Sequence, residues 1–209
     1  HDEPKLMLKL YTAPMAPNPR AVENILALKG IEVETILVDL MAGENRGDDF
    51  VRVNPAGQLP ALQTPEGQVI AEVAAIAEYL EELKPDPVLV GATAGERAHT
   101  RMRMRQMDYL VLSPMMMGYR HTEGAEFFGP RMRIDPAIGA TMKLIASDGL
   151  SWLETQMQGH DFICGSQVSY VDCAAYPLMS FLSKVSQPID ESLTQVTAFM
   201  ARCASHEVL

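Results

Sequence analysis

The sequence predicts a small mixed α/β domain followed by an all-helical domain. Three observations support this fold class: a strand, a helix and a second strand open the chain, a hairpin and another helix follow, and only helical patterns appear after residue 94. We place the first domain at residues 5–84 and the second at residues 94–205. The helix-breaking run Lys84-Pro-Asp-Pro87 and the small residues after it predict the linker between them.

The chain should begin with a strand–helix–strand unit. Leu6–Tyr11 is a short apolar run that predicts a buried strand, and the proline-rich stretch after it predicts a loop. A helix should follow, with Asn18 as its cap, Pro19 at its first position and Gly30 at its end. Ile31–Val38 carries β-branched residues and predicts the second strand. Because a helix makes the crossover, we expect the two strands to be parallel.

A hairpin and a helix complete the first domain. Residues 41–53 are polar and contain glycine, so they predict a loop with at most a short helix. Residues 61–64 and 68–71 flank the turn-forming Pro65-Glu-Gly67, which predicts a hairpin. The helix after it shows one apolar face, made of Val73, Ile76, Ala77, Leu80 and Leu83.

The second domain should contain three helical regions. Residues 96–117 predict one long helix or two, and residues 138–157 and 170–185 predict two more. Pro177 should kink or break the last of these helices.

The composition argues against nucleic-acid and membrane partners. The 209 residues carry a formal net charge of -10, whereas a nucleic-acid binder normally shows a basic excess on one face. No segment approaches the roughly 18 uninterrupted apolar residues of a membrane helix. The three cysteines are widely spaced and lack a Cys-x-x-Cys pair. They therefore favour reduced thiols in a cytoplasmic protein over a disulfide framework or a metal site.

Two motifs in the first domain resemble the N-terminal signature of the cytosolic glutathione S-transferases. Asn54-Pro-Ala-Gly-Gln-Leu-Pro-Ala-Leu62 follows the family's Asn-Pro-x-Gly-x-Val-Pro-x-Leu, and Glu72-Val-Ala-Ala-Ile-Ala-Glu-Tyr-Leu80 follows its Glu-Ser-x-Ala-Ile-x-x-Tyr-Leu. Later in the chain, Ser169-Tyr-Val-Asp172 resembles the family's capping box. The resemblance spans residues 5–185. It implies a thioredoxin-like N-terminal domain, a helical C-terminal domain and a homodimer.

The resemblance also implies that reduced glutathione is bound as a co-substrate. Its cysteinyl backbone would pair with the N–H and C=O groups of Leu59, which a cis bond to Pro60 turns outward. Glu72 and Val73 would hold the γ-glutamyl carboxylate at a helix N-terminus, where N–H groups and the helix dipole favour an anion. Gln58 would add a further polar contact.

Two positions depart from the family pattern. Val73 replaces a serine hydroxyl that would bind the carboxylate, and this loss should weaken glutathione binding by roughly 1.5–3 kcal/mol while the backbone N–H remains. Ala16 aligns with a Thr or Ser of the bacterial nu-type enzymes and cannot donate to the glutathione sulfur. Asn18 matches the nu-type asparagine, so we assign the sulfur contact to it, although a simple helix cap is an equally good interpretation. Tyr11 and Thr12 are weaker candidates.

The electrophilic substrate should bind in the second domain, by the same resemblance. The side chains at the family's pocket positions are Tyr109, Met116, Tyr119 and Arg120. Because the chain contains 14 methionines, ordinary core packing is a competing interpretation for the methionines of this region.

The expected activity is attack of the glutathione thiolate on an apolar electrophile, in detoxification. Two alternatives stay open. One is glutathione-dependent reduction of disulfides or peroxides, which the resemblance at Asn18 permits. The other is a non-catalytic binding or regulatory protein that keeps the fold, which Ala16 and Val73 favour.

Overall fold

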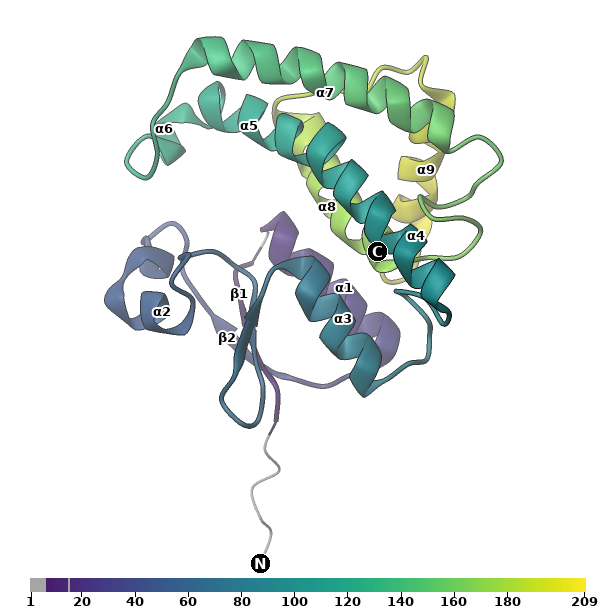
Figure 1. The fold of residues 1–209 in the computed structure, drawn as a ribbon. Coiled ribbons are helices and arrows are strands. Elements are labelled where there is room, and N and C mark those ends of the chain that lie inside the picture. The colour runs from purple at the N-terminus through teal and green to yellow at the C-terminus, as the bar shows by residue number, and fades with distance from the viewer. Residues whose placement is uncertain (1–6, 15) are drawn as a thin grey trace, which may run out of the picture. The chain divides into compact units, whose positions relative to one another are not determined.

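The computed structural model describes residues 7–14 and 16–209. Contacts divide the chain into two compact units, one ending at Val90 and the other beginning at Gly91. Figure 1 labels the α-helices of both units and strands β1 and β2. Leu6, the first residue of the predicted N-terminal strand, lies outside the described residues.

The first unit is built on a four-stranded sheet with the strand order β2-β1-β3-β4. Strand β1 (Lys9–Thr12) pairs in parallel with β2 (Glu34–Leu37), as the helical crossover predicts. Strand β3 (Ala61–Gln63) is antiparallel to β1 and to β4 (Val69–Ala71), which confirms the hairpin. Helices α1 (Pro17–Lys29) and α3 (Val73–Leu83) cover one face of this sheet, and η1 (Glu44–Arg46) and α2 (Asp48–Val53) lie on the other side (Figure 1).

Each face of the sheet has its own apolar core. On the α1 and α3 face, the fully buried side chains are Leu10, Val22, Ile25, Leu62, Ile76 and Leu80. On the α2 face, a smaller buried cluster consists of Ala13, Val38, Phe50, Leu59 and Ala61. Successive side chains of a strand point to opposite faces of the sheet, and both faces of this sheet are covered by an apolar core. These strands therefore show little alternation of polar and apolar residues in the sequence.

Helix α1 begins two residues earlier than the sequence predicts. Pro17, not Pro19, is the first helical residue, and Ala16 occupies the cap position without a side-chain hydrogen bond. Asn18 therefore lies inside the first turn, and its interpretation as the helix cap is wrong. Proline at position 17 has its φ fixed near the helical value and lacks the N–H that the first turn leaves unpaired. The predicted end is confirmed, because Gly30 adopts the left-handed conformation.

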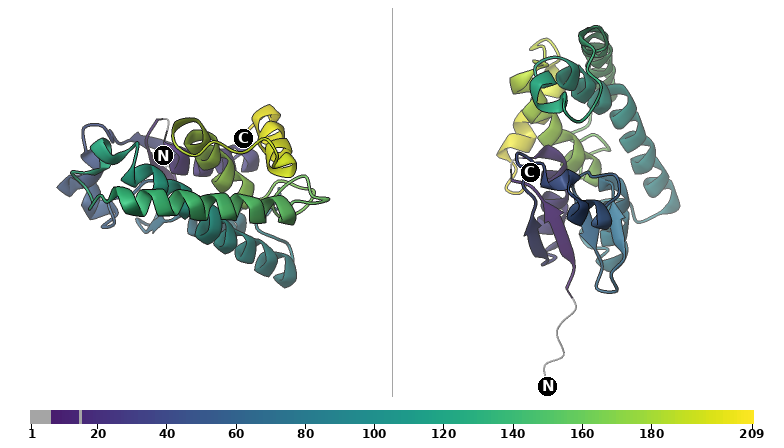
Figure 2. Two further views of the ribbon diagram at one scale, coloured as in Figure 1. Left: turned by 90° about the horizontal axis from the view of Figure 1, so that it is seen from above. Right: turned by 90° about the vertical axis from the view of Figure 1, so that its left-hand side faces the viewer.

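The second unit consists of helices. Helix α4 (Ala94–Met107), a π-helical turn η2 (Asp108–Leu112) and α5 (Ser113–His121) follow one another without a break. The remaining helices are α6 (Ala125–Phe128), α7 (Pro136–Gln156), α8 (Tyr170–Val185) and α9 (Thr194–Ser205). Helix α7 runs beside α5 in Figures 1 and 2, and α8 continues through Pro177 as one helix. Helices α6 and α9 lie outside the helical segments that the sequence predicts.

Two residues of α7 make contacts with neighbouring elements that depend on the residue type. A Cβ atom on Gly149 would lie 1.9 Å from the carbonyl oxygen of Leu110, so only glycine allows η2 to approach this closely. One turn later, the Glu154 carboxylate accepts hydrogen bonds from the N–H groups of Gln195 and Val196, at 2.9 Å each. A side chain of α7 thereby caps α9, whose own cap residue, Leu193, cannot do so.

A buried carboxyl group organises the start of α8. Asp172 accepts hydrogen bonds from the N–H groups of Ile163 and Ser169 and from the Ser169 hydroxyl, at 2.7–2.8 Å. Complete burial nevertheless dominates and raises the pKa of Asp172 to about 6, against these three hydrogen bonds. The motif thus forms a capping box at the start of α8, as its resemblance to the family's capping box implies.

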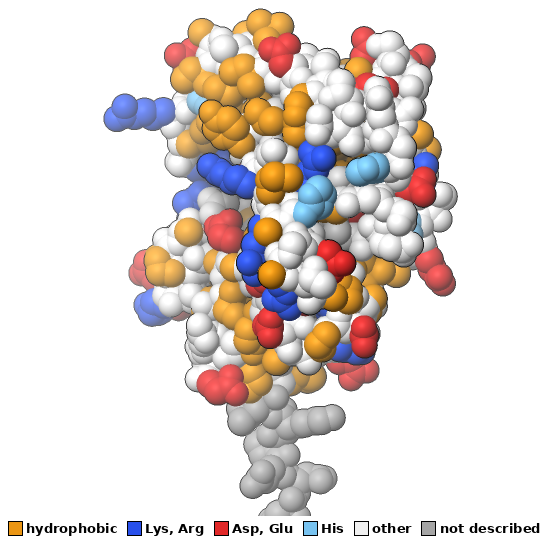
Figure 3. All heavy atoms as spheres, turned by 45° about the vertical axis from the view of Figure 1, so that its right-hand side comes forward, with side chains coloured by type: hydrophobic (Ala, Val, Ile, Leu, Met, Phe, Trp, Pro, Cys, Tyr) orange, Lys and Arg blue, Asp and Glu red, His pale blue; other side chains and the backbone are white. Residues whose placement is uncertain are grey.

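The surface mixes both signs of charge. On the face shown in Figure 3, acidic and basic side chains stand among apolar ones and form no single charged field. Across the described residues, none of the helices has the length and apolarity that crossing a bilayer requires.

Candidate functional site

Strand register brings the predicted glutathione-binding segments to one end of the sheet. Ala61 pairs with Ala71 on β4 and with Tyr11 on β1. The residues just before β3, just after β4 and just after β1 therefore meet at the same edge. These are the Leu59-Pro60 step, Glu72 at the start of α3, and the loop that leads into α1.

The Leu59 backbone is available for a ligand. The Leu59–Pro60 bond is cis and the Leu59 side chain is buried in the α2-face core. Two amide side chains hold the preceding loop: Asn54 Nδ2 donates to the Gln58 carbonyl and Asn45 Nδ2 to the Gly57 carbonyl, both at 2.8 Å. Within residues 7–14 and 16–209, neither the N–H nor the C=O of Leu59 has a hydrogen-bond partner. An extended peptide could pair with both groups.

Glu72 has an unusual backbone conformation. With φ at 70°, it is the single non-glycine residue with positive φ that the described part of the chain contains. Such a conformation costs on the order of 1–3 kcal/mol, and observed strain of this kind is common at ligand sites. Glu72 occupies the cap position of α3, and its exposed side chain makes no capping hydrogen bond.

The first turn of α3 can receive an anion through its backbone. The N–H groups of Val73, Ala74 and Ala75 have no partner inside the helix, because Ile76 is the first residue that bonds back, to Glu72. They form the positive end of the helix dipole. The half-buried Val73 side chain adds no hydroxyl, so an anion here depends on N–H donors alone.

The hydroxyl groups nearest to the start of α1 already have partners. The Thr12 hydroxyl is buried and donates to Glu23 Oε1 at 2.8 Å, and the Tyr11 hydroxyl donates to Gln63 Oε1 at 3.2 Å. Both weaker candidates for the sulfur contact are thus engaged within the unit. This leaves Asn18, whose side chain is exposed and for which the described residues offer no hydrogen-bond partner.

The first turn of α1 is poor in donors. Pro17 and Pro19 have no N–H, and the Arg20 N–H bonds to the Ala16 carbonyl at 3.2 Å. Among the described residues the Asn18 N–H has no partner, and it lies next to that residue's own side-chain amide. Asn18 can therefore donate to an anion at the start of α1.

A cation that the sequence motifs do not indicate lies at this end of the sheet. Arg46 lies against Gly57, where an added Cβ would come within 3.3 Å of Arg46 Nη1. Gly57 has φ at 61° and is two residues from Leu59. The Arg46 side chain is exposed, so it can reach an anion near the Leu59 backbone. The positive φ of Gly57 is invisible in the sequence, and nothing in the motif marks the arginine eleven positions earlier.

The residues predicted for an electrophile pocket fall into two groups within the second unit. Tyr119 packs edge-on against Phe128 and Phe181, and the Arg120 guanidinium lies 5.1 Å from the centre of the Phe128 ring. Tyr109, 68% exposed on η2, lies with Arg105, whose guanidinium is 5.7 Å from its ring centre. Met116 is half-buried on α5.

The three cysteine thiols of the second unit are buried or half-buried. Burial raises the pKa of Cys164 to about 11 and raises the pKa values of Cys173 and Cys203 above their usual range. All three thiols therefore stay protonated near neutral pH. Among the described residues, no three His, Cys, Asp or Glu side chains cluster as a metal site would require.

Comparisons of the whole chain agree with the motifs. Residues 6–82 match the family described as glutathione S-transferase, N-terminal domain, and residues 146–207 match glutathione S-transferase, C-terminal domain. Glutathione S-transferase 2 of Saccharomyces cerevisiae is 25% identical over 202 residues, which cover 95% of this chain and 86% of the relative. Glutathione S-transferase D7 of Drosophila melanogaster is 32% identical over 168 residues, or 79% of this chain and 70% of the relative.

A solved structure shows the same fold. The crystal structure of Gtt2 from Saccharomyces cerevisiae superposes with a TM-score of 0.89 at 23% sequence identity, covering 96% of this chain and 97% of that chain. It confirms the expected thioredoxin-like N-terminal domain and helical C-terminal domain. Taken with the two matching domains and the Drosophila relative, it leads to one conclusion: the chain belongs to the glutathione S-transferase family.

Proposed function

We propose that the protein is a glutathione transferase that binds reduced glutathione at the sheet edge formed by Leu59, Glu72 and Val73. The observation that carries this proposal is the unpaired backbone of Leu59 beside the strained Glu72 and the open first turn of α3. A tripeptide with two carboxylates matches this arrangement, because it offers a strand-like backbone to Leu59 and an anion to α3.

The two ends of glutathione would meet different donors. The γ-glutamyl carboxylate would bind the N–H groups at the start of α3, with the Glu72 carboxylate close to the ligand's amino group. The glycyl carboxylate would face Arg46, which lies beside Gly57. Gln58, exposed on the same loop, would add a polar contact.

The sulfur would lie near the start of α1. Asn18 contributes an N–H and a side-chain amide there, and both can donate to a thiolate. Donation lowers the thiol pKa and increases the fraction in the nucleophilic form, which would attack an apolar electrophile. The protein's further contribution would be to hold thiolate and electrophile in a reactive orientation.

Family membership supports a proposal for the electrophile pocket and for the assembly state. We propose that Tyr119, Arg120 and Met116 line the electrophile pocket, and that Tyr109 belongs to it less directly. We further propose a homodimer that acts in cytoplasmic detoxification, without nucleic-acid or membrane partners.

One alternative reaction and one alternative role compete with conjugation. Reduction of peroxides or disulfides by glutathione would use the same thiolate at Asn18. A binding protein without turnover would keep the glutathione site but stabilise the sulfur poorly, and Ala16 together with the engaged Tyr11 and Thr12 hydroxyls favours this role.

Calorimetric titration with glutathione and its two dipeptide fragments tests the proposal. Reduced glutathione should bind with a Kd between micromolar and millimolar. Cysteinylglycine should bind more weakly because it lacks the γ-glutamyl carboxylate that would bind the start of α3. Arg46→Ala should lower the affinity for glutathione but not the affinity for γ-glutamylcysteine. Absence of glutathione binding at several millimolar would sink the proposal. Turnover assays with an aryl halide, a hydroperoxide and 2-hydroxyethyl disulfide then separate the three roles.

A further inference from the structure

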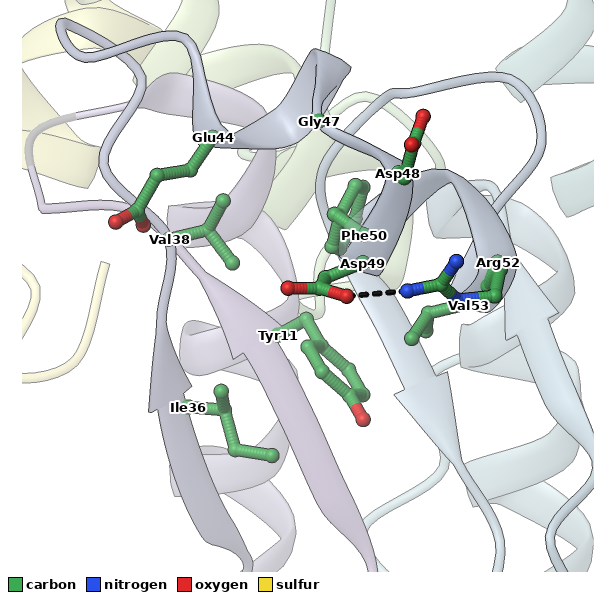
Figure 4. A pocket seen from close by; sticks show the side chains of 10 residues that line it. All are labelled: Tyr11, Ile36, Val38, Glu44, Gly47, Asp48, Asp49, Phe50, Arg52 and Val53. Atoms are coloured by element: carbon green, nitrogen blue, oxygen red, sulfur yellow. Dashed lines mark hydrogen bonds and ion pairs between the residues drawn. The ribbon is translucent and has the colours of Figure 1, made fainter.

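A pocket of about 610 Å³ lies between α2 and the sheet of the first unit (Figure 4). Its floor is apolar. Phe50 packs edge-on to Tyr11 with ring centroids 5.9 Å apart. The other apolar lining residues are Ile36, Val38 and Val53. The pocket shares no lining residue with the proposed glutathione site, and its volume is in the range that holds a small organic ligand.

The rim of this pocket is acidic. It carries three carboxylates, Glu44, Asp48 and Asp49, and one guanidinium, Arg52. Asp49 is paired with Arg52, three residues further along α2 (Figure 4), so those two charges offset each other. Among the described residues, Glu44 accepts one hydrogen bond, from the Asp39 N–H at 2.7 Å.

Two carboxylates are left without a cation. Asp48 is exposed and has no hydrogen bond or ion pair within the part of the chain that the structure describes, and Glu44 has no basic partner there either. An apolar, partly aromatic floor below an acidic rim is complementary to one chemical class of ligand. An apolar body would cover the floor, and a positive charge would lie near the rim and the aromatic rings.

We propose that this pocket binds small amphipathic organic cations, in which a protonated amine is attached to an aromatic body. An anionic ligand of the same shape would face uncompensated negative charge, and a neutral one would gain only the floor contact. Because the carboxylates are exposed, the selectivity for a cation should be several-fold and should fall as salt screens the rim.

Three probes of one shape test the charge preference: 2-naphthylmethylamine, 2-naphthylmethanol and 2-naphthoate, titrated at pH 7 in low salt. Binding is followed by the amide NMR shifts of Ile36, Val38, Gly47 and Phe50. The amine should bind at least three-fold more tightly than the alcohol, the carboxylate should bind most weakly, and 0.5 M NaCl should bring amine and alcohol together.

Charge-removing variants test the rim directly. The double variant Glu44→Gln, Asp48→Asn should bind the amine no more tightly than the alcohol. Its affinity for the alcohol should equal that of the unmodified protein. Asp148→Asn, which removes an exposed charge from α7, is the matched control and should change neither. Four results would each overturn the proposal. The first two are equal affinities of amine and alcohol in the unmodified protein and NMR shifts confined to residues outside the pocket. The others are displacement of the probe by reduced glutathione and no binding of any probe at its solubility limit.

Discussion

Position 73 determines how many donors an anion meets at the start of α3. Val73→Ser keeps the backbone N–H and adds a hydroxyl at the first helical position, where a side-chain donor can reach a carboxylate. We expect glutathione to bind roughly ten- to hundred-fold more tightly, since one added hydrogen bond to a charged group is worth about 1.5–3 kcal/mol. Calorimetry measures the change, and Val73→Thr should reproduce part of it. Unchanged affinity for both variants would place the γ-glutamyl carboxylate elsewhere.

Asp172 should give the helical unit a specific pH dependence. Its pKa is about 6 in the folded chain and near 3.8 when unfolded. Between these values the folded chain holds a proton that the unfolded chain has lost, so stability should fall as pH rises from about 4 to 6. A shift of this size corresponds to roughly 2–3 kcal/mol.

Denaturant unfolding at several pH values checks this, with Asp172→Asn as the comparison. The variant cannot titrate at this position, and its absolute stability should be lower because an amide cannot accept all three hydrogen bonds. The informative quantity is the difference in unfolding free energy between the two proteins. That difference should shrink from pH 4 to pH 6.5, and parallel curves would contradict the prediction.

Sequence patterns indicate candidate site residues most specifically where one motif contains them. The Leu59-Pro60 step and the Glu72–Val73 helix start each lie within one short stretch. The capping role of Asn18 was wrong because Pro17 and Pro19 are both suited to a first turn, and a one-dimensional pattern cannot choose between them. Arg46 was missed because its position depends on the backbone of Gly57, which no neighbouring residue specifies.

Helix α7 and the π-helical turn η2 can touch only because Gly149 has no side chain. Gly149→Ala would place a methyl group 1.9 Å from the Leu110 carbonyl oxygen, and α7 would have to move away. We expect destabilisation of about 3 kcal/mol, measured by denaturant unfolding followed by helical circular dichroism. The matched control is Gly95→Ala in α4, where the methyl group meets nothing within 4 Å. It should stabilise slightly, by about 0.5 kcal/mol, and equal effects of both substitutions would contradict this account.

Element types were predictable and their details were not. The β-branched and amphipathic periodicities identified the strands and the long helices. The π-helical turn η2 changes the number of residues per turn over only five positions, too few to stand out in the sequence pattern, so residues 96–117 predict one long helix or two without marking the turn. Helix α9 went unnoticed because its cap comes from Glu154, forty residues earlier, and not from a local signal.

A buried ion pair connects the end of α1 with α3 and with the last residues of the first unit. Lys29 and Glu81 are 2.7 Å apart and fully buried, and Lys29 Nζ also donates to the Lys84 and Pro87 carbonyls. The Glu81 carboxylate accepts the Leu89 and Val90 N–H groups. Burial alone would raise the pKa of Glu81, but Lys29 and these N–H groups lower it below its usual value.

Removing one partner of this pair should destabilise the first unit. Lys29→Met leaves the Glu81 carboxylate buried without its cation, which costs about 3–5 kcal/mol. Adding Glu81→Gln removes the unpaired charge and should recover part of the loss. Thermal unfolding of both variants provides the measurement, and a double variant no more stable than the single one would contradict the role assigned to the charge. The two-unit organisation could be predicted from the sequence. The Lys29–Glu81 pair could not, because the two residues lie too far apart in the chain for a local sequence pattern to connect them.

The Glu154 cap has a consequence for hydrogen exchange. In most helices the first-turn amides exchange freely with solvent, because no carbonyl of the helix shields them. At the start of α9 the amides of Gln195 and Val196 are held by a side chain of another helix. Their deuterium uptake should therefore be slow and set by the rate at which α7 and α9 separate, so two amides at a helix terminus would report the opening of the helical unit.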